Sequence, residues 1–399
     1  MPESTHFETQ AIRTQIERSQ HQEHTAPLYL TSSFTFQDAE QMRARFADEE
    51  PGNIYSRFSN PNCSELIDKL CLLEGAEAGY AVATGMAAVF TALAGLLKSG
   101  DHILACRSVF GSTHSVLTRL LPRWNIDHTY ADIHDTDSWA NLVRPETKIL
   151  LVETPSNPAV DILDLNWLGD FAKAHGLLLV VDNCFATPYL QQPIKFGADI
   201  VLHSATKYID GQGRVLGGLI LGKQELIDEI RFFARHAGPA LSPFNAWVLS
   251  KSLETLAVRM DRHCQNALAL AEWLEERDEV NLVKYPFLPS HPQYEIAKAQ
   301  MTQGGGIVSF DIKGGVEAGR HFLDSLKLTS LTANLGDSRT IATHPASTTH
   351  SKVDESIRQS VGITPGLIRI SVGLEHIDDI RKDLAQALVH SQTHMPIAI

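Results

Sequence analysis

The chain has 399 residues and a formal net charge of −13, from 34 basic and 47 acidic residues. It is longer than one ordinary hydrophobic core supports, so we expect more than one structural unit. The acidic balance and the lack of a basic stripe argue against nucleic acid as a partner. No apolar run reaches the roughly 18–20 residues that span a bilayer, so we expect no membrane partner either.

The N-terminal segment and the cysteines indicate the compartment. The first 24 residues are polar and of mixed charge, which does not fit a signal peptide. The five cysteines stand singly with no C-x-x-C pair, which is typical of a reduced protein without structural zinc. We therefore expect a cytoplasmic protein without a bound metal.

Residues 1–60 predict an extended arm rather than a domain. The segment is largely polar, and proline, glycine and asparagine gather in DEEPGNIYSRFSNPN (48–62). A helical repeat of leucines follows at 64–75, and Gly75 ends it as a C-cap.

Residues 61–250 alternate short apolar runs with amphipathic helical patterns, which predicts an α/β domain with helices on both faces of a sheet. The expected strands are Gly79–Ala83, His102–Ala105, Ile149–Glu153, Leu177–Asp182, Ile200–His203 and Leu219–Leu221. The expected helices include Met86–Leu97, Ser112–Leu121 and Leu165–His175. Several strands are apolar at consecutive positions, as in a mostly parallel sheet buried on both faces. Active groups should then lie at the carboxyl ends of the strands.

Residues 251–399 predict a smaller α+β domain. A long helical pattern runs from Pro243 to about Arg277, and strands at Gly306–Ile312 and Leu367–Val372 precede a closing helix at 377–390. The stretch 334–366 is rich in Thr, Ser, His, Gly and Pro and is mostly loop by composition.

Some motifs suggest chemistry that their context does not support. The segment 217–224 fits G-x-x-x-x-G-K, but Gln224 replaces the magnesium-binding hydroxyl, so we interpret it as a strand and turn. The glycines at 211–217 have the wrong spacing for a dinucleotide fingerprint and indicate a flexible loop. His344 and His350 have no acidic partner nearby and are better explained as loop polarity than as metal ligands.

Two features at strand ends carry weak signals when taken alone. Thr84-Gly85-Met86 leads a strand into a helix, where free N–H groups can bind phosphate. Asp182 ends an apolar strand, and a buried carboxylate needs a cation. By itself Asp182 is better explained as a helix N-cap or a buried salt bridge.

The third strand end makes the combination specific. Ser204 and Thr206 bracket Lys207 directly after a strand, and glycines follow. A lysine that is partly removed from water has a lowered pKa and can form an imine with an aldehyde. Together, the lysine, hydroxyls, acid and glycine turn are the parts that bind pyridoxal phosphate.

The sequence resembles the pyridoxal-phosphate enzymes of Cys/Met metabolism, the cystathionine γ-synthase family of fold type I, over essentially its whole length. The matching blocks are IYSRFSNPN (54–62), LEGAE (73–77), ATGMAA (83–88), VETPSNP (152–158), VVDNCFATP (180–188), ADIVLHSATKYIDG (198–211), THPASTTH (343–350) and LIRISVGLE (367–375). The resemblance implies an α/β aminotransferase-like fold.

The resemblance also implies a role for each matching residue. Lys207 corresponds to the lysine that binds the cofactor and moves protons, and Asp182 to the partner of the ring nitrogen. Ser204, Thr206, Gly85 and Met86 correspond to the phosphate cup. Tyr55 and Arg57 match the pair that reaches the phosphate in a neighbouring subunit. Asn157 matches a residue near the cofactor hydroxyl and the substrate carboxylate, which Arg369 would clamp.

The sequence departs from the family pattern at two positions. Phe110 stands where the family usually has a ring-stacking tyrosine, so it can stack but cannot exchange a proton. Asn334 stands where many relatives have serine. Both features are similar to the direct sulfhydrylase branch, especially the form that uses O-succinylhomoserine.

The resemblance therefore implies γ-replacement of O-succinyl-L-homoserine by sulfide, giving L-homocysteine and succinate for methionine biosynthesis. Cystathionine γ-synthase activity with cysteine, the use of O-acetylhomoserine and a γ-lyase remain open. A non-catalytic cofactor-binding or regulatory protein is a further alternative. Sharing of Tyr55 and Arg57 implies an obligate dimer, paired into a homotetramer.

Overall fold

The computed structural model describes residues 6–348, 355–360 and 362–393, and its central feature is a sheet of seven strands. The spatial order is β1-β7-β6-β5-β4-β2-β3, and neighbouring strands are parallel except where β7 is involved. The strands are β1 Ala78–Val82, β2 His102–Cys106, β3 Asp127–Ala131, β4 Thr147–Glu153, β5 Leu178–Asp182, β6 Ile200–Ser204 and β7 Gly218–Gly222. The predicted mostly parallel central sheet is confirmed.

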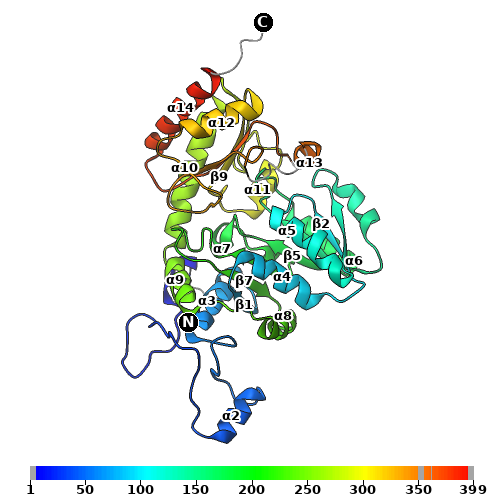
Figure 1. Ribbon diagram of the computed structural model, residues 1–399, viewed down its shortest axis with the longest axis vertical. Helices are drawn as coiled ribbons and strands as arrows, with labels where there is room; N and C mark the ends of the chain where they lie inside the picture. Colours follow the sequence, from blue (N-terminus) through cyan, green and yellow to red (C-terminus); the bar gives the residue numbers. More distant parts are fainter. Residues whose placement is uncertain (1–5, 349–354, 361, 394–399) are drawn as a thin grey trace.

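Helices cover both faces of this sheet (Figure 1). On β2, Ile103 and Ala105 pack into the cluster beneath α4 and α8, whereas Leu104 packs into the cluster beneath α6. This alternation follows from the period of two along a strand and makes both faces apolar. The helices around the sheet are α3 Pro61–Glu74, α4 Gly85–Leu96, α6 Leu165–His175, α8 Gln224–Ala237 and α9 Pro243–Leu253. Gly75 ends α3 with φ +79°, as predicted.

The C-terminal part contains a second sheet with the order β10-β11-β12-β9-β8. Its strands are β8 Val280–Lys284, β9 Ile307–Ile312, β10 Ser330–Leu331, β11 Ile341–Thr343 and β12 Leu367–Ser371. Three helices pack on one face, namely α10 Leu256–Glu275, α12 Gly315–Ser325 and α14 Ile377–Thr393. Ile368 and Ile370 face these helices, so the side chain of Arg369 points the other way, toward the first sheet.

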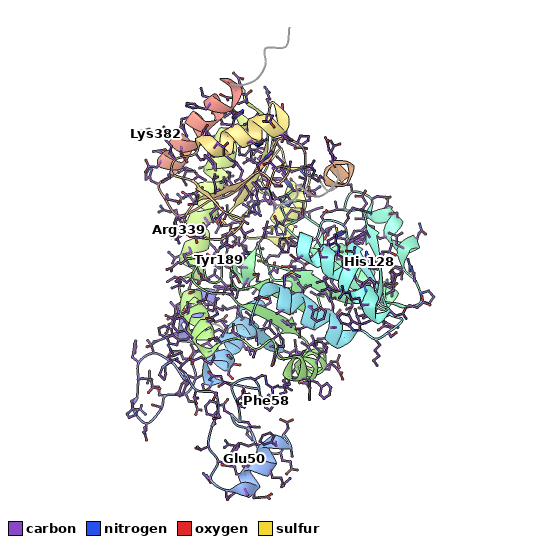
Figure 2. All side chains as sticks on the ribbon, viewed as in Figure 1. Glu50, Phe58, His128, Tyr189, Arg339 and Lys382 are labelled. Atoms are coloured by element: carbon purple, nitrogen blue, oxygen red, sulfur yellow. The ribbon has the colours of Figure 1, made fainter. Side chains whose placement is uncertain are left out.

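The remaining helices are α1 Phe7–Arg13, α2 Ala39–Phe46, α5 Gly111–Ser115, α7 Thr187–Leu190, α11 Tyr294–Gln300 and α13 Glu355–Ser360. Helix α1 packs on α3, whereas the segment that carries α2 extends away from both sheets (Figure 1). Phe58 lies between this segment and the body of the protein (Figure 2). Among the described residues, no helix is long and apolar enough to cross a bilayer.

Several predicted elements differ from the structure. Strand β3 was missed because its sequence DHTYA is polar and it forms an edge of the sheet. The helix expected from Pro243 to Arg277 is two helices that separate at Glu254 and Thr255. The helix expected over 112–121 is an α-helix only as far as Ser115, and the π-helix Val116–Leu120 follows it.

The C-terminal loop and the rejected motifs have mixed outcomes. The stretch 334–366, predicted as mostly loop, also contains β11 and α13. The interpretation of 217–224 as strand and turn is confirmed, because Gly218–Gly222 is β7. His344 is buried and bonds to Ser347 and to the Pro365 carbonyl, whereas His350 lies outside the described residues. The domain boundary predicted between residues 250 and 251 lies within α9, and the division into domains stays a prediction.

A buried lysine joins α3 to α9. Lys69 is fully buried, and its Nζ lies 3.4 Å from Glu65 Oε1 and 3.5 Å from Glu254 Oε1. It also donates to the Ser250 carbonyl at 3.3 Å. Burial lowers the pKa of Lys69, so the two carboxylates are needed to keep it charged.

We expect Lys69→Ala to lower the free energy of unfolding by about 3–5 kcal/mol, because Glu65 would be left buried without its cation. Urea denaturation followed by circular dichroism measures this loss. The exposed Arg320, which pairs with Glu317, provides a control whose alanine variant should change stability by less than about 1 kcal/mol. Equal losses in the two variants would contradict the prediction.

Candidate active site

A cavity of about 280 Å³ lies at the carboxyl ends of β4, β5 and β6 and reaches the second sheet. Three neighbouring parallel strands end there, so their last residues share one edge. Nine of the residues singled out from the sequence line the cavity, namely Gly85, Met86, Phe110, Asn157, Asp182, Ser204, Thr206, Lys207 and Arg369. These residues come from segments that span most of the chain.

Lys207 lies in the turn that follows β6, and its side chain is mostly removed from water. Its Nζ donates a hydrogen bond to Asn334 Oδ1 at 2.6 Å. Burial lowers the pKa of Lys207, and the positive charge of Arg369 lowers it further. The amine therefore loses its proton more readily than an exposed lysine, as a nucleophile or general base requires.

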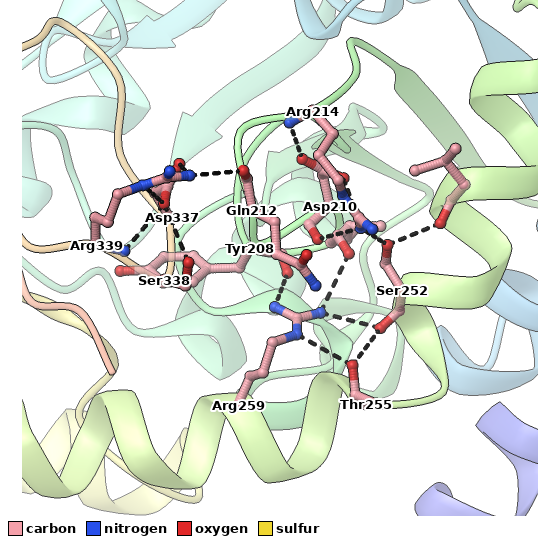
Figure 3. Close-up of polar contacts among 12 residues, drawn as sticks. Tyr208, Asp210, Gln212, Arg214, Ser252, Thr255, Arg259, Asp337, Ser338 and Arg339 are labelled. Carbon is pink, nitrogen blue, oxygen red and sulfur yellow. Dashed lines mark hydrogen bonds and ion pairs between the residues drawn. The ribbon is translucent and has the colours of Figure 1, made fainter. Parts of the chain in front are cut away.

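Arg259 holds the turn that carries Lys207 (Figure 3). Its guanidinium donates to the Tyr208 carbonyl at 2.6 Å and to the Ile209 carbonyl at 3.2 Å. A third bond, to the Ser252 carbonyl at 3.1 Å, fixes the arginine to the end of α9. The lysine backbone is thereby tied to the helix layer.

The loop from Asn334 to Thr340 packs directly on this turn. Gly336 has φ +73°, and a Cβ there would lie 2.6 Å from the Tyr208 nitrogen. Asp337 and Arg339 in this loop pair with each other at 2.9 Å. Arg339 also donates to the Gln212 carbonyl at 3.0 Å (Figure 3). These two residues do not line the cavity but hold one loop against the other.

Asp182 ends β5 at the base of the cavity. It accepts a hydrogen bond from the Cys184 backbone nitrogen at 3.0 Å, and no basic side chain among the described residues forms an ion pair with it. Burial raises the pKa of Asp182 to about 6. A protonated ring nitrogen would supply the missing positive partner and restore the charged carboxylate.

The start of α4 forms a narrow cup beside β6. Thr84 is the N-cap and accepts from the Ala87 nitrogen at 3.0 Å, while the first N–H groups of the helix have no partner within it. A Cβ on Gly85 would lie 2.5 Å from the Ser204 Cβ and 2.7 Å from its hydroxyl. The Thr206 hydroxyl accepts from the Gly217 nitrogen at 3.2 Å. The absence of a side chain at Gly85 keeps the cup open for an anion.

Arg369 closes the opposite side of the cavity. Its guanidinium donates to Asn157 Oδ1 at 2.9 Å and to the Asn334 carbonyl at 3.1 Å. The Nε atom is buried without a partner, and within the described part of the chain no carboxylate pairs with this arginine. Burial lowers its pKa to about 10. Arg369 is thus a buried cation between two other strands, suited to a ligand carboxylate, and not a surface arginine.

Phe110 is the residue before α5 and lines the cavity. Its phenyl ring has no ionisable group, so it can contribute only packing against a flat ligand. Asn334 is not part of the cavity wall, but its side chain bonds Lys207 and its carbonyl bonds Arg369.

Tyr55 and Arg57 lie away from the cavity of their own chain. Both are exposed, and the Arg57 guanidinium lies 5.6 Å from the Tyr55 ring centroid and 4.7 Å from that of Phe58. Arg57 also donates to the Arg235 carbonyl. The prediction that they reach a neighbouring subunit stays a prediction.

Glu153, which also lines the cavity, was not singled out from the sequence. It ends β4 beside Asp182 in β5. The same signal that selected Asp182, an acidic residue directly after an apolar strand, was present in Ile149–Glu153.

A sequence profile of the family described as Cys/Met metabolism PLP-dependent enzyme matches residues 8–389. The chain belongs to this family. It is 47% identical to an O-succinylhomoserine sulfhydrylase of Pseudomonas aeruginosa, over 97% of this chain and 96% of that protein. It is 44% identical to an L-methionine gamma-lyase of Fusobacterium nucleatum, over 91% of this chain and 92% of the relative.

The structural similarity agrees with the family. A Campylobacter jejuni protein named as an O-acetylhomoserine (thiol)-lyase, solved with a pyridoxyl-lysine phosphate group, matches with a TM-score of 0.93 and 35% identity. The match covers 96% of this chain and all of that one. The fold is therefore fold type I, and the cofactor of the enzyme is pyridoxal phosphate. The open cup at Gly85 and the unpaired Asp182 fit this cofactor.

We expect Gly85→Ala to weaken cofactor binding by about 5- to 150-fold, because the new methyl group would fill the cup beside Ser204. Titration of the cofactor-free protein with pyridoxal phosphate, followed by absorbance, measures the affinity. Gly111→Ala is the matched control, since a Cβ at Gly111 meets nothing within 4 Å. Equal affinities in the two variants would show that the cup lies elsewhere.

Proposed function

We propose that the enzyme catalyses γ-replacement, converting O-succinyl-L-homoserine and sulfide to L-homocysteine and succinate. The observation that carries the proposal is that Asn334 accepts a hydrogen bond from Lys207 and another from Arg369. An amino-acid substrate whose carboxylate binds Arg369 would place its Cα next to the lysine amine. The 47% identity to an O-succinylhomoserine sulfhydrylase supports the choice of substrate.

In the proposed site, Ser204, Thr206 and the N–H groups of Gly85 and Met86 would hold the phosphate. Asp182 would keep the ring nitrogen protonated, and Phe110 would pack on the ring face. When bound, pyridoxal phosphate withdraws electrons from the substrate Cα and so acts as an electron sink. Asn157 and Arg369 would orient the substrate through its carboxylate.

The proton steps fall to Lys207. Its neutral amine would take a proton from the substrate Cα, give that proton up within the site, and then take a second proton from Cβ. The C–O bond at Cγ then breaks, and succinate leaves with the bonding electrons. Hydrosulfide forms the new C–S bond at Cγ, and Lys207 returns protons to Cβ and Cα. Phe110 has no proton to exchange, so the lysine has no second acid–base group on that side.

We further infer that Tyr55 and Arg57 complete the site of a neighbouring subunit in a cytoplasmic homotetramer built from dimers. The support is that both side chains are exposed and lie away from the cavity of their own chain. They follow α2 closely in the sequence, and the segment that carries α2 extends away from both sheets (Figure 1).

A product assay tests the reaction. The cofactor-loaded enzyme should convert O-succinyl-L-homoserine and sulfide mainly to homocysteine, measured by chromatography. Cystathionine as main product from cysteine, or a preference for O-acetylhomoserine, would replace the proposed substrate pair. Release of 2-oxobutyrate would favour a γ-lyase, the activity for which the 44% identical relative is named.

Lys207→Ala should lower turnover by at least about 10²-fold, because both proton transfers would be lost.

Mixed oligomers test the shared site. Arg57→Ala and Lys207→Ala chains should each be nearly inactive alone, but their mixture should regain activity. In a mixed dimer, one site would combine Lys207 of one chain with Arg57 of the other, so that site would be intact. Activity of refolded mixtures measures this, and no recovery over the separate variants would show that each chain builds its site alone.

A further inference from the structure

Glu153 is a buried acid of the cavity that the roles proposed above leave without a function. It is the last residue of β4 and lies opposite Asp182 in the parallel ladder with β5. Its side chain is only 6% exposed and lines the cavity. No basic group in the described ranges forms an ion pair with it, so the acid is not there to balance a cation.

The contacts of Glu153 connect the two sides of the cavity. Its Oε2 accepts a hydrogen bond from the Phe110 backbone nitrogen at 2.8 Å. The Asn157 backbone N–H also acts on this carboxyl group and lowers its pKa. The Glu153 side chain thus contacts both the turn that carries Phe110 and the loop that carries Asn157.

Burial raises the pKa of Glu153 well above that of an ordinary glutamate, and the charge of Asp182 raises it further. The N–H groups of Phe110 and Asn157 lower the pKa and only partly offset this effect. With Asp182 charged against the ring nitrogen, the neighbouring acid is more stable when it carries its proton. A neutral side chain of the same shape should therefore be able to take the place of Glu153 without loss of cofactor binding.

We propose that Glu153 is a positioning residue for the cofactor ring, which acts by holding the backbone of Phe110 and Asn157 beside Asp182. The inference rests on the cofactor and substrate roles proposed above for these three residues. It is separate from the choice of substrate, since it concerns how tightly and in what surroundings the cofactor is held.

The test compares Glu153→Gln with Glu153→Leu. Glutamine keeps an oxygen that accepts the bond from the Phe110 nitrogen, so its cofactor dissociation constant and visible absorption band should match the unaltered protein within about twofold. Leucine has a similar size but accepts no bond, so its cofactor affinity should fall by at least about tenfold and its band should shift. Normal cofactor binding by the glutamine variant, together with weakened binding by the leucine variant, would show that the hydrogen-bond acceptor matters and the charge does not.

Glu65 provides the matched control, since it is also buried but contacts Lys69 on α3 and Ser250 on α9, outside the cavity. Folded Glu65→Leu should keep the affinity and the band. If Glu153→Leu does not fold, Glu153→Asp replaces it, and its shorter carboxyl should weaken affinity by about 3- to 10-fold.

Three results would overturn the proposal: leucine or aspartate variants that bind the cofactor normally, a glutamine variant as impaired as the leucine variant, or an equal effect from Glu65→Leu. The product assay with Lys207→Ala does not depend on Glu153. A failure here therefore leaves the proposed reaction intact, and a failure of the reaction leaves this test valid.

Discussion

The parallel arrangement of β4, β5 and β6 is the constraint on which the rest of the site depends. Parallel strands end at the same edge of a sheet, so Glu153 lies beside Asp182, and Ser204 ends the next strand at the same edge, although the three are far apart in the sequence. The turns beyond this edge carry Lys207 and Asn157. Because the strands are apolar on both faces, these polar groups stand at the boundary of a dry core, where their pKa values shift.

The second sheet closes the cavity and completes its charge pattern. Ile368 and Ile370 are buried under helices, which directs Arg369 toward Asn157 and Asn334. Burial lowers the pKa of Lys207 and Arg369 and raises that of Asp182, so each charge is unfavourable until an opposite charge is present. A ligand with a phosphate, a protonated ring and an amino-acid carboxylate would supply these opposite charges together.

Much of this arrangement could be predicted from the sequence, because short apolar runs with polar ends are a local signal. Lys207, Asp182 and the Gly85 turn were all found in this way. Strand β3 was missed, since an edge strand with one solvated face lacks the apolar run. Glu153 ends an apolar strand as Asp182 does, but its contacts with the backbone groups of Phe110 and Asn157 leave no mark in the sequence, so only the structure distinguishes it.

The sequence by itself determined the class of fold, the family and the candidate residues for the cofactor, because these depend on local patterns and ordered motifs. Only the tertiary structure decided which groups meet. It showed that Asn334 bonds both Lys207 and Arg369, that Arg259 holds the turn after the lysine, and that Arg57 lies outside the cavity of its own chain. The physical reason is that pairing of strands and packing of two sheets bring together residues more than 100 positions apart, and no local pattern specifies those contacts.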